Sequence, residues 1–191
     1  MALRASQMIG LGQSLPKFDL LDVVSGQRIS NDDIKDKNVL IMFICNHCPY
    51  VKHVWDEFSR LENDYQDKTI KILAINSNDL ENYPQDGPEH MKKLHQTMNW
   101  SFPFLLDEKQ SFAKALHAAC TPDFYIFDAQ HKLQYRGQLD DSRPGNGVKV
   151  TGQDLRQALD FVIAGEALNL EQKPSIGCNI KWKPGNEPDY F

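Results

Sequence analysis

The stretch Val39–Pro49, with the sequence VLIMFICNHCP, carries the signals that decide the fold of this chain. Its first six residues, Val39–Ile44, are all apolar, which is typical of a strand buried on both faces. Two cysteines follow, Cys45 and Cys48, and Pro49 comes directly after the second. Proline is preferred at the first position of a helix because its missing N–H would have no partner there. The stretch therefore predicts a buried strand that leads into a helix, with Cys48 at the helix N-terminus.

The position of Cys48 predicts a reactive thiol. A side chain at a helix N-terminus lies near unpaired backbone N–H groups and the positive end of the helix dipole. Both stabilise a thiolate, which is the nucleophilic form of cysteine. The neighbouring His47, when protonated, would stabilise that thiolate further. We therefore predict that Cys48 is a redox-active nucleophile; the alternative is a buried structural thiol.

Strand and helix signals alternate along the rest of the chain. Helices are predicted over 49–65, 89–98, 110–118 and about 152–164, and strands over 18–23, 39–44, 70–75, 124–128 and 131–138. This order predicts an α/β fold with a central mixed sheet flanked by helices on both faces. Asp86–Glu89 is interpreted as a turn. Residues 174–191 are rich in proline and glycine, so we expect an irregular tail after a domain that spans 1–173.

Composition narrows the class of protein. The 191 residues are 41% hydrophobic and 25% charged, as in an ordinary globular domain. The net charge of −5 argues against a general nucleic-acid surface or an anionic-membrane surface. The longest apolar run is too short to cross a bilayer, no secretory signal is visible, and four cysteines do not make a disulfide framework. We therefore expect a cytoplasmic protein with selected reactive thiols.

Further phrases of the sequence accompany this stretch in a fixed order. They are LPKFDL at 15–20, FPFLLD at 102–107, and Thr121-Pro122 followed by 124–128. Together they resemble the thioredoxin-like superfamily, and within it the redoxin branch of peroxiredoxins and thiol–disulfide interchange proteins. The match covers roughly residues 10–165, and its cysteine segments are similar to a peroxiredoxin-like subgroup. The resemblance implies a thioredoxin-like fold and a thiol-dependent oxidoreductase that exchanges disulfides or reduces peroxides.

The same resemblance implies how the site is built. In that superfamily the bond before the Thr-Pro proline is cis, and its loop faces the attacking cysteine. Thr121 and Pro122 would therefore form the far wall of the site around Cys48 and dock an extended partner strand by backbone hydrogen bonds. His47 and Pro49 complete the predicted substrate-binding residues. Reducing equivalents would come from a thiol system such as thioredoxin, and no organic cofactor is expected.

The chain departs from the family pattern where both standard catalytic sets would stand. Three residues after Cys48, at the usual second cysteine, it has Val51. Cys45 stands where a peroxiredoxin has threonine or serine, and Pro122 falls near the position of the peroxiredoxin arginine. Met42 aligns with the buried carboxylate of thioredoxin. The replacements at the peroxiredoxin positions argue against fast peroxidase activity, because the donors that stabilise peroxide cleavage are missing. At Met42 the carboxylate that assists proton transfer in thioredoxin is missing too, so neither standard catalytic set is complete.

Three other cysteines could resolve an oxidised Cys48. The two-residue spacer would allow a disulfide between Cys45 and Cys48. The fold implied by the resemblance would bring Cys120 near Cys48 as well, and the sequence does not choose between Cys45 and Cys120. Cys178, in the tail, is a third candidate, although packing beside Trp182 is the simpler expectation.

Metal binding is an alternative class of function. Four metal-ligating side chains lie within nine residues: Cys45, His47, Cys48 and His53. The phrase Asn-His-Cys-Pro also resembles the start of a copper-chaperone motif on this fold, although that motif has a second cysteine where this chain has Lys52. The alternative to an enzyme is therefore a non-catalytic redox sensor or a copper- or zinc-binding protein.

Overall fold

The computed structural model describes residues 2–66, 68–169 and 171–191, and its centre is a seven-stranded sheet. In chain order the strands are β2 (Asp19–Asp22), β3 (Arg28–Ser30), β4 (Asn38–Phe43), β5 (Ile70–Asn76), β6 (Phe104–Leu106), β8 (Asp123–Phe127) and β9 (Leu133–Gly137). In space their order is β3-β2-β6-β5-β4-β8-β9. β4 lies between β5, to which it is parallel, and β8, to which it is antiparallel. The predicted mixed sheet is therefore confirmed.

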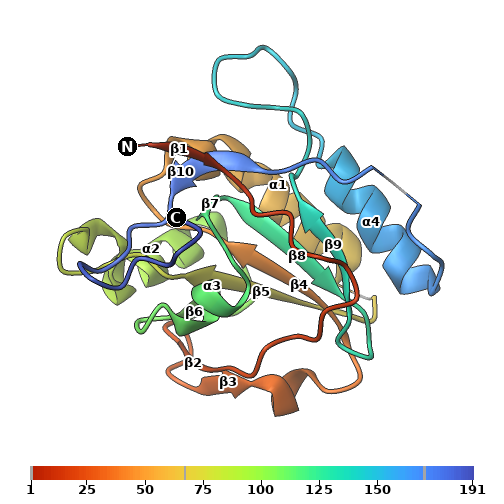
Figure 1. Cartoon of the computed structure of the whole chain (residues 1–191), viewed down its shortest axis with the longest axis horizontal. Helices are drawn as coiled ribbons and strands as arrows, with labels where there is room; N and C mark the ends of the chain where they lie inside the picture. Colours follow the sequence, from red (N-terminus) through yellow and green to blue (C-terminus); the bar gives the residue numbers. More distant parts are fainter. Residues whose placement is uncertain (1, 67, 170) are drawn as a thin grey trace.

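Helices cover both faces of this sheet, as predicted (Figure 1). The α-helices in the described ranges are α1 (Pro49–Tyr65), α2 (Pro88–Met98), α3 (Ser111–Ala115) and α4 (Gln153–Ala164), and two short 3-10 helices are η1 (Asn31–Ile34) and η2 (Pro84–Asp86). The fully buried β4 explains the arrangement, because successive side chains of a strand point to opposite faces. Leu40 and Met42 pack with α1, α2 and α4, whereas Ile41 and Phe43 pack with α3.

The opening stretch folds as its sequence predicts. Pro49 occupies the first turn of α1 and Cys48 is its N-cap residue. Apolar residues at three- and four-residue spacing, including Val51, Val54 and Phe58, form the buried face of α1. The strand-to-helix turn thus leaves Cys48 at one edge of the sheet, where β4 ends.

The segment expected to be an irregular tail contains a strand, and this part of the prediction is wrong. β10 (Ile176–Asn179) lies between β1 (Leu3–Ala5) and β7 (Cys120–Thr121) in a three-stranded antiparallel sheet (Figure 1). Gly177 misled the interpretation, because glycine in a strand can also mark a close approach of another backbone. A Cβ atom at Gly177 would lie 2.0 Å from the Thr121 carbonyl oxygen. The domain boundary at residue 173 stays a prediction.

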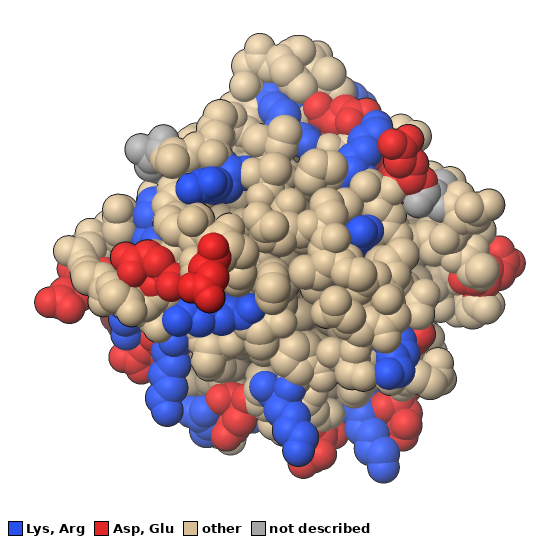
Figure 2. Space-filling model, in the orientation of Figure 1, with Lys and Arg blue, Asp and Glu red and all other residues tan. Residues whose placement is uncertain are grey.

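The surface shows charges of both signs. On the face drawn in Figure 2, lysine and arginine side chains lie beside aspartate and glutamate and form no single continuous patch of one sign. None of the helices in the described ranges combines the length and apolar character needed to cross a bilayer.

Candidate active site

Cys48 lies fully buried at the N-terminus of α1. Its Sγ atom is 3.2 Å from the carbonyl oxygen of Thr121, a contact in which a protonated Cys48 donates the hydrogen bond. The Thr121–Pro122 peptide bond is cis, as the family resemblance implied. The Thr121 hydroxyl lies 3.5 Å from the Sγ atom of Cys45. The structure therefore brings Cys45, Cys48, Thr121 and Pro122 together, from segments more than 70 residues apart.

Hydrogen-bond donors around Cys48 lower its pKa to about 2. The largest cause is a hydrogen bond from Cys178, followed by one from Cys45; Thr121 and the Val51 backbone N–H also lower the pKa, and burial opposes them. The Thr121 carbonyl oxygen can accept a hydrogen bond only from the protonated form of Cys48, so this contact favours the thiol. The four donors favour the thiolate. The donors prevail, and the site stabilises a negative charge on Cys48.

The two neighbouring thiols keep their protons. Burial raises the pKa of Cys45 well above its ordinary value, and the hydrogen bond to Cys48 is the second cause. For Cys178 the order is reversed: the hydrogen bond to Cys48 is the largest cause of its raised pKa, and burial comes second. Cys48 is thus the thiol of this group that ionises, and Cys45 and Cys178 are its donors.

A buried carboxylate, Asp86, organises the loop between the two cysteines. It accepts hydrogen bonds from the backbone N–H groups of Asn46 (2.9 Å) and His47 (3.2 Å) and from the side-chain amide of Asn78 (2.8 Å). The Nδ1 atom of His47 lies 2.5 Å from Asp86 Oδ2, the oxygen that also accepts from Asn78. Asp86 ends η2 at a position that the sequence suggested was only a turn, so sequence reasoning missed its role. Nothing local marks this role, because the two residues of the cysteine loop that it binds, Asn46 and His47, are about 40 residues away.

A family model places this geometry among known proteins. The model of the AhpC/TSA family matches residues 11–136, about two thirds of the chain. The chain belongs to the AhpC/TSA family. The thioredoxin-like protein YneN of Bacillus subtilis (strain 168) is 27% identical over 150 residues, which cover 78% of this chain and 79% of that protein. The predicted redoxin membership is therefore confirmed.

Solved structures share the fold of this chain. An uncharacterized conserved protein from Geobacillus kaustophilus is 55% identical, with a TM-score of 0.93 over 96% of this chain and 98% of that chain. A hypothetical protein from Sinorhizobium meliloti 1021 is 42% identical, with a TM-score of 0.91 over 94% and 98%. The thioredoxin domain of a thiol-disulfide oxidoreductase from Bacteroides vulgatus, 18% identical over 81% and 99%, has a TM-score of 0.63 and shows the shared fold. The AhpC/TSA-family protein thus has the predicted thioredoxin-like fold.

His47 of this AhpC/TSA-family protein faces Asp86 and Cys45. Its Nδ1 atom lies 3.9 Å from the Cys45 sulfur. Its ring stacks on that of Tyr83, with the two ring centroids 5.5 Å apart. We expected His47 to stabilise the Cys48 thiolate directly, but the donors to Cys48 are the two thiols, Thr121 and a backbone N–H. The contacts of His47 instead fix the loop that positions Cys48.

Cys120 belongs to a different group of side chains. Its Sγ atom lies 3.7 Å from the Pro122 carbonyl oxygen and 4.0 Å from the Ser175 carbonyl oxygen. Burial, and then the charge of Asp123, raise its pKa well above the ordinary value. Neighbouring side chains of a strand point to opposite faces, so Cys120 points away from the side on which Thr121 meets Cys45.

Two of the four residues predicted as metal ligands, Cys45 and His47, lie in a cluster that could hold a metal ion, and Asp86 is its third member. Cys45, His47 and Asp86 each offer a ligand atom, and these atoms lie within 4.8 Å of one another. The Nε2 atom of His53 lies 2.7 Å from the Ser142 hydroxyl oxygen, so the fold directs this histidine elsewhere. A cysteine, a histidine and a carboxylate are all ligands that Zn²⁺ accepts.

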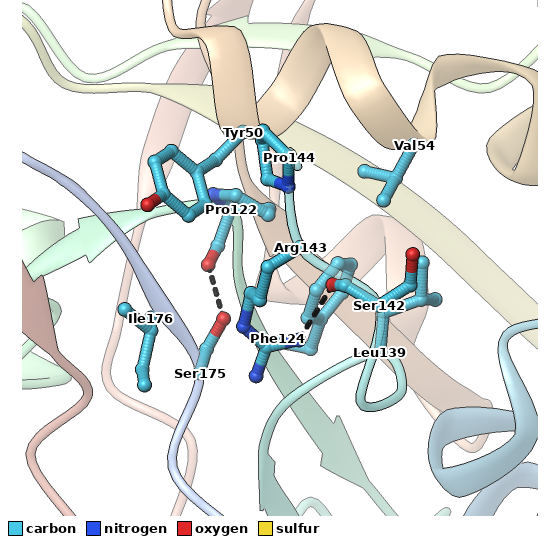
Figure 3. A pocket seen from close by; sticks show the side chains of 10 residues that line it. All are labelled: Tyr50, Val54, Pro122, Phe124, Leu139, Ser142, Arg143, Pro144, Ser175 and Ile176. Carbon is cyan, nitrogen blue, oxygen red and sulfur yellow. Dashed lines mark hydrogen bonds between the residues drawn. The ribbon is translucent and has the colours of Figure 1, made fainter. Parts of the chain in front are cut away.

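The cis-proline side of the site is closed. Tyr50, Pro122, Ser175 and Ile176 are among the residues that line a cavity here (Figure 3). The volume of this cavity is about 10 Å³, which is space for about one water molecule. The Ser175 hydroxyl donates to the Pro122 carbonyl oxygen at 2.6 Å and fastens the segment that leads into β10 (Figure 3). This segment therefore forms a cover on the cis-proline side of the site, and Cys48 is fully buried.

Asp123 predicts a pH dependence of stability. Burial raises the pKa of this fully buried carboxyl to about 7, against hydrogen bonds donated by Ser6 and Tyr125. The unfolded chain loses the same proton near pH 4, so between about pH 4 and pH 7 the folded state binds more protons and the free energy of unfolding falls as pH rises. Three pKa units correspond to about 4 kcal/mol. We expect Asp123→Asn to remove most of this slope in urea denaturation.

The control for Asp123→Asn is Asp56→Asn, at an exposed position of α1. This variant should keep the wild-type dependence of the unfolding free energy on pH. An Asp123→Asn protein with the wild-type slope would show that the buried carboxyl is not its origin.

Proposed function

We propose that this AhpC/TSA-family protein is a thiol–disulfide oxidoreductase with Cys48 as its nucleophile. The observation that carries the proposal is the position of the Cys48 sulfur at the N-terminus of α1, 3.2 Å from the Thr121 carbonyl oxygen of the cis Thr121–Pro122 bond. Hydrogen-bond donors around this sulfur lower its pKa. The Cys48 thiolate attacks one sulfur of a substrate disulfide and forms a mixed disulfide, and the other sulfur leaves as a thiolate that takes up a proton. A second thiol of the chain then attacks Cys48 and releases the remaining half of the substrate.

The stabilised thiolate also indicates the partner. A low thiol pKa makes that sulfur a good leaving group and makes its disulfides easy to reduce. A thiol reductant such as thioredoxin would therefore regenerate the enzyme readily. Disulfides are better supported as substrates than peroxides, because a second thiol, Cys45, stands where a peroxiredoxin has its hydroxyl donor.

The pH profile of Cys48 tests this proposal. Reduced protein is treated with oxidised glutathione at pH 4 to 8, and the rate at which Cys48 is oxidised, to either a mixed or a protein disulfide, is measured by mass spectrometry. A thiol with a pKa near 8.5 loses about tenfold in thiolate for each pH unit below that value. Because the pKa of Cys48 is about 2, we expect its rate to stay nearly constant across this range. A rate that falls tenfold per unit below pH 8 would contradict the stabilised thiolate.

Turnover separates the enzyme from a redox sensor. With dithiothreitol as reductant, the enzyme reduces many equivalents of oxidised glutathione per Cys48. A protein that becomes oxidised once and then stops would be a sensor, and the oxidoreductase proposal would be wrong.

Zinc binding is the second candidate function, and the cluster of Cys45, His47 and Asp86 favours it. Its test is the zinc content of protein dialysed against Zn²⁺, compared between wild type and Cys45→Ser. One equivalent that is lost in the variant would support the site, and equal content in both proteins would exclude it.

A further inference from the structure

Strand β10 occupies the backbone edge next to the cis-proline loop. Its antiparallel register with β7 places Cys178 opposite Thr121 and Asn179 opposite Cys120. Thr121 is also the residue whose carbonyl oxygen lies 3.2 Å from the Cys48 sulfur. We propose that Cys178 is the thiol that resolves an oxidised Cys48, and that β10 carries it into the site as a built-in substrate strand. The inference rests on the proposed role of Cys48 as nucleophile.

The geometry places Cys178 on the correct side of the strand. Residues directly opposite each other in an antiparallel pair point to the same face, so Cys178 lies on the face of Thr121. The Thr121 side chain meets Cys45 on that face, and Cys178 forms a hydrogen bond with Cys48 itself. Helix α1 packs against β10, and Cys45, Cys48 and Cys178 lie in one buried cluster. Cys178 is thus in contact with the sulfur that it would attack.

Gly177 lets β10 lie close to the cis-proline loop. A Cβ atom at Gly177 would lie 2.0 Å from the Thr121 carbonyl oxygen and 3.2 Å from the Pro122 nitrogen, so only glycine lets β10 lie this close to the cis-proline loop. The opposite edge of β10 pairs with β1, where Leu3 faces Cys178. Ser6 and Ser175 exchange two hydrogen bonds of 2.9 Å between the segments that lead into these strands. The strand is therefore fixed on both edges with Cys178 at Cys48.

The contacts of the two thiols favour Cys178 over Cys45 as the attacking thiol. The Cys45 sulfur lies 3.5 Å from the Thr121 hydroxyl and 3.9 Å from the Nδ1 atom of His47, so the fold gives it partners of its own. Cys178 lies opposite Thr121 in the β10–β7 pair, and the Thr121 carbonyl oxygen is 3.2 Å from the Cys48 sulfur.

The resolving step balances with the substrate as oxidant. A disulfide RSSR forms a Cys48–SR mixed disulfide and releases one RSH. The Cys178 thiolate then attacks the Cys48 sulfur, the Cys48–Cys178 bond forms, the Cys48–SR bond breaks, and the leaving thiolate takes up the proton that Cys178 lost. One RSSR has been reduced to two thiols, and two protein thiols have been oxidised. Because Cys48 is fully buried, the site must open before RSSR can react with its sulfur.

Disulfide mapping after limiting oxidised glutathione tests the inference. In the wild type we expect a Cys48–Cys178 disulfide. In Cys178→Ser we expect the Cys48–glutathione mixed disulfide to accumulate and to last at least about tenfold longer than in wild type. The matched control is Cys120→Ser, whose sulfur has its contacts with Pro122 and Ser175 and which should resolve at the wild-type rate.

A second variant keeps the test independent of the cysteine itself. Gly177→Ala retains the Cys178 thiol but forces β10 away from Thr121, so it should also accumulate the mixed disulfide; Gly10→Ala, where a Cβ atom meets only ordinary contact distances, is its control. A disulfide of Cys48 with Cys45 or Cys120 in the wild type, or resolution at the wild-type rate in Cys178→Ser, would overturn the role of Cys178 and leave Cys48 as nucleophile. If Cys48 stays reduced in all of these proteins, forming neither a mixed disulfide nor a protein disulfide, the proposed function and this inference are both overturned.

Discussion

Cys48→Ser is expected to lower the turnover of oxidised glutathione by on the order of a thousandfold or more, because a serine hydroxyl is not ionised under these conditions and forms no mixed disulfide. Several hydrogen-bond donors act on the Cys48 sulfur and lower its pKa: the side chains of Cys178, Cys45 and Thr121, and the backbone N–H of Val51. A hydroxyl of similar size leaves the surrounding packing in place, so the loss should be chemical and not structural.

The measurement is steady-state reduction of oxidised glutathione with dithiothreitol, beside far-UV circular dichroism to verify folding. Cys120→Ser, at a buried thiol that contacts Pro122 and Ser175, serves as the matched cysteine replacement and should retain turnover. Turnover by Cys48→Ser within tenfold of wild type would assign the nucleophile to another cysteine.

Asp86→Ala is expected to cost about 3–5 kcal/mol of unfolding free energy, as is typical when one partner of a buried charged network is removed. The substitution leaves the backbone N–H groups of Asn46 and His47 and the Asn78 amide without their acceptor. An unsatisfied buried donor is costly because it has lost its water and gains nothing in exchange. The loop that holds Cys48 would loosen, so turnover should fall as well.

Urea denaturation measures the unfolding free energy of each variant, and Asp86→Asn is an intermediate variant for comparison. The asparagine keeps one acceptor oxygen for the loop but loses the charge beside His47, so its unfolding free energy should lie between those of wild type and Asp86→Ala. Asp56→Ala, on the exposed side of α1, should change the unfolding free energy by less than about 0.5 kcal/mol. A loss below about 1 kcal/mol in Asp86→Ala would show that the network does not hold the loop.

The parts of the site that the sequence predicted are those with local signals. The apolar run before Cys48 and the helix-opening Pro49 are contiguous, so the strand, the helix and the thiol between them could be read together. The cis bond at Thr121–Pro122 followed from the family resemblance. These features depend on neighbours in sequence or on a known motif.

The parts that were missed depend on contacts between distant segments. Asp86 looks like a turn residue until the fold brings it under the Cys45–Cys48 loop. β10 has four residues, one of them glycine, and only its pairing with β1 and β7 makes it a strand. Four residues are too few to show the alternation of polar and apolar side chains that marks a strand in a sequence. This strand depends on its pairing with neighbouring strands, which the sequence pattern does not show.

The cover formed by β10 also determines how a shortened form of the protein would behave. A chain shortened before residue 176 would keep Cys48, α1 and the cis-proline loop, but the outer edge of β7 would be left without its neighbour. Exposed strand edges of this kind recruit strands from other molecules. The same unpaired backbone would lie beside a reactive sulfur, so such a shortened protein would be prone both to self-association and to cross-linking between copies through Cys48.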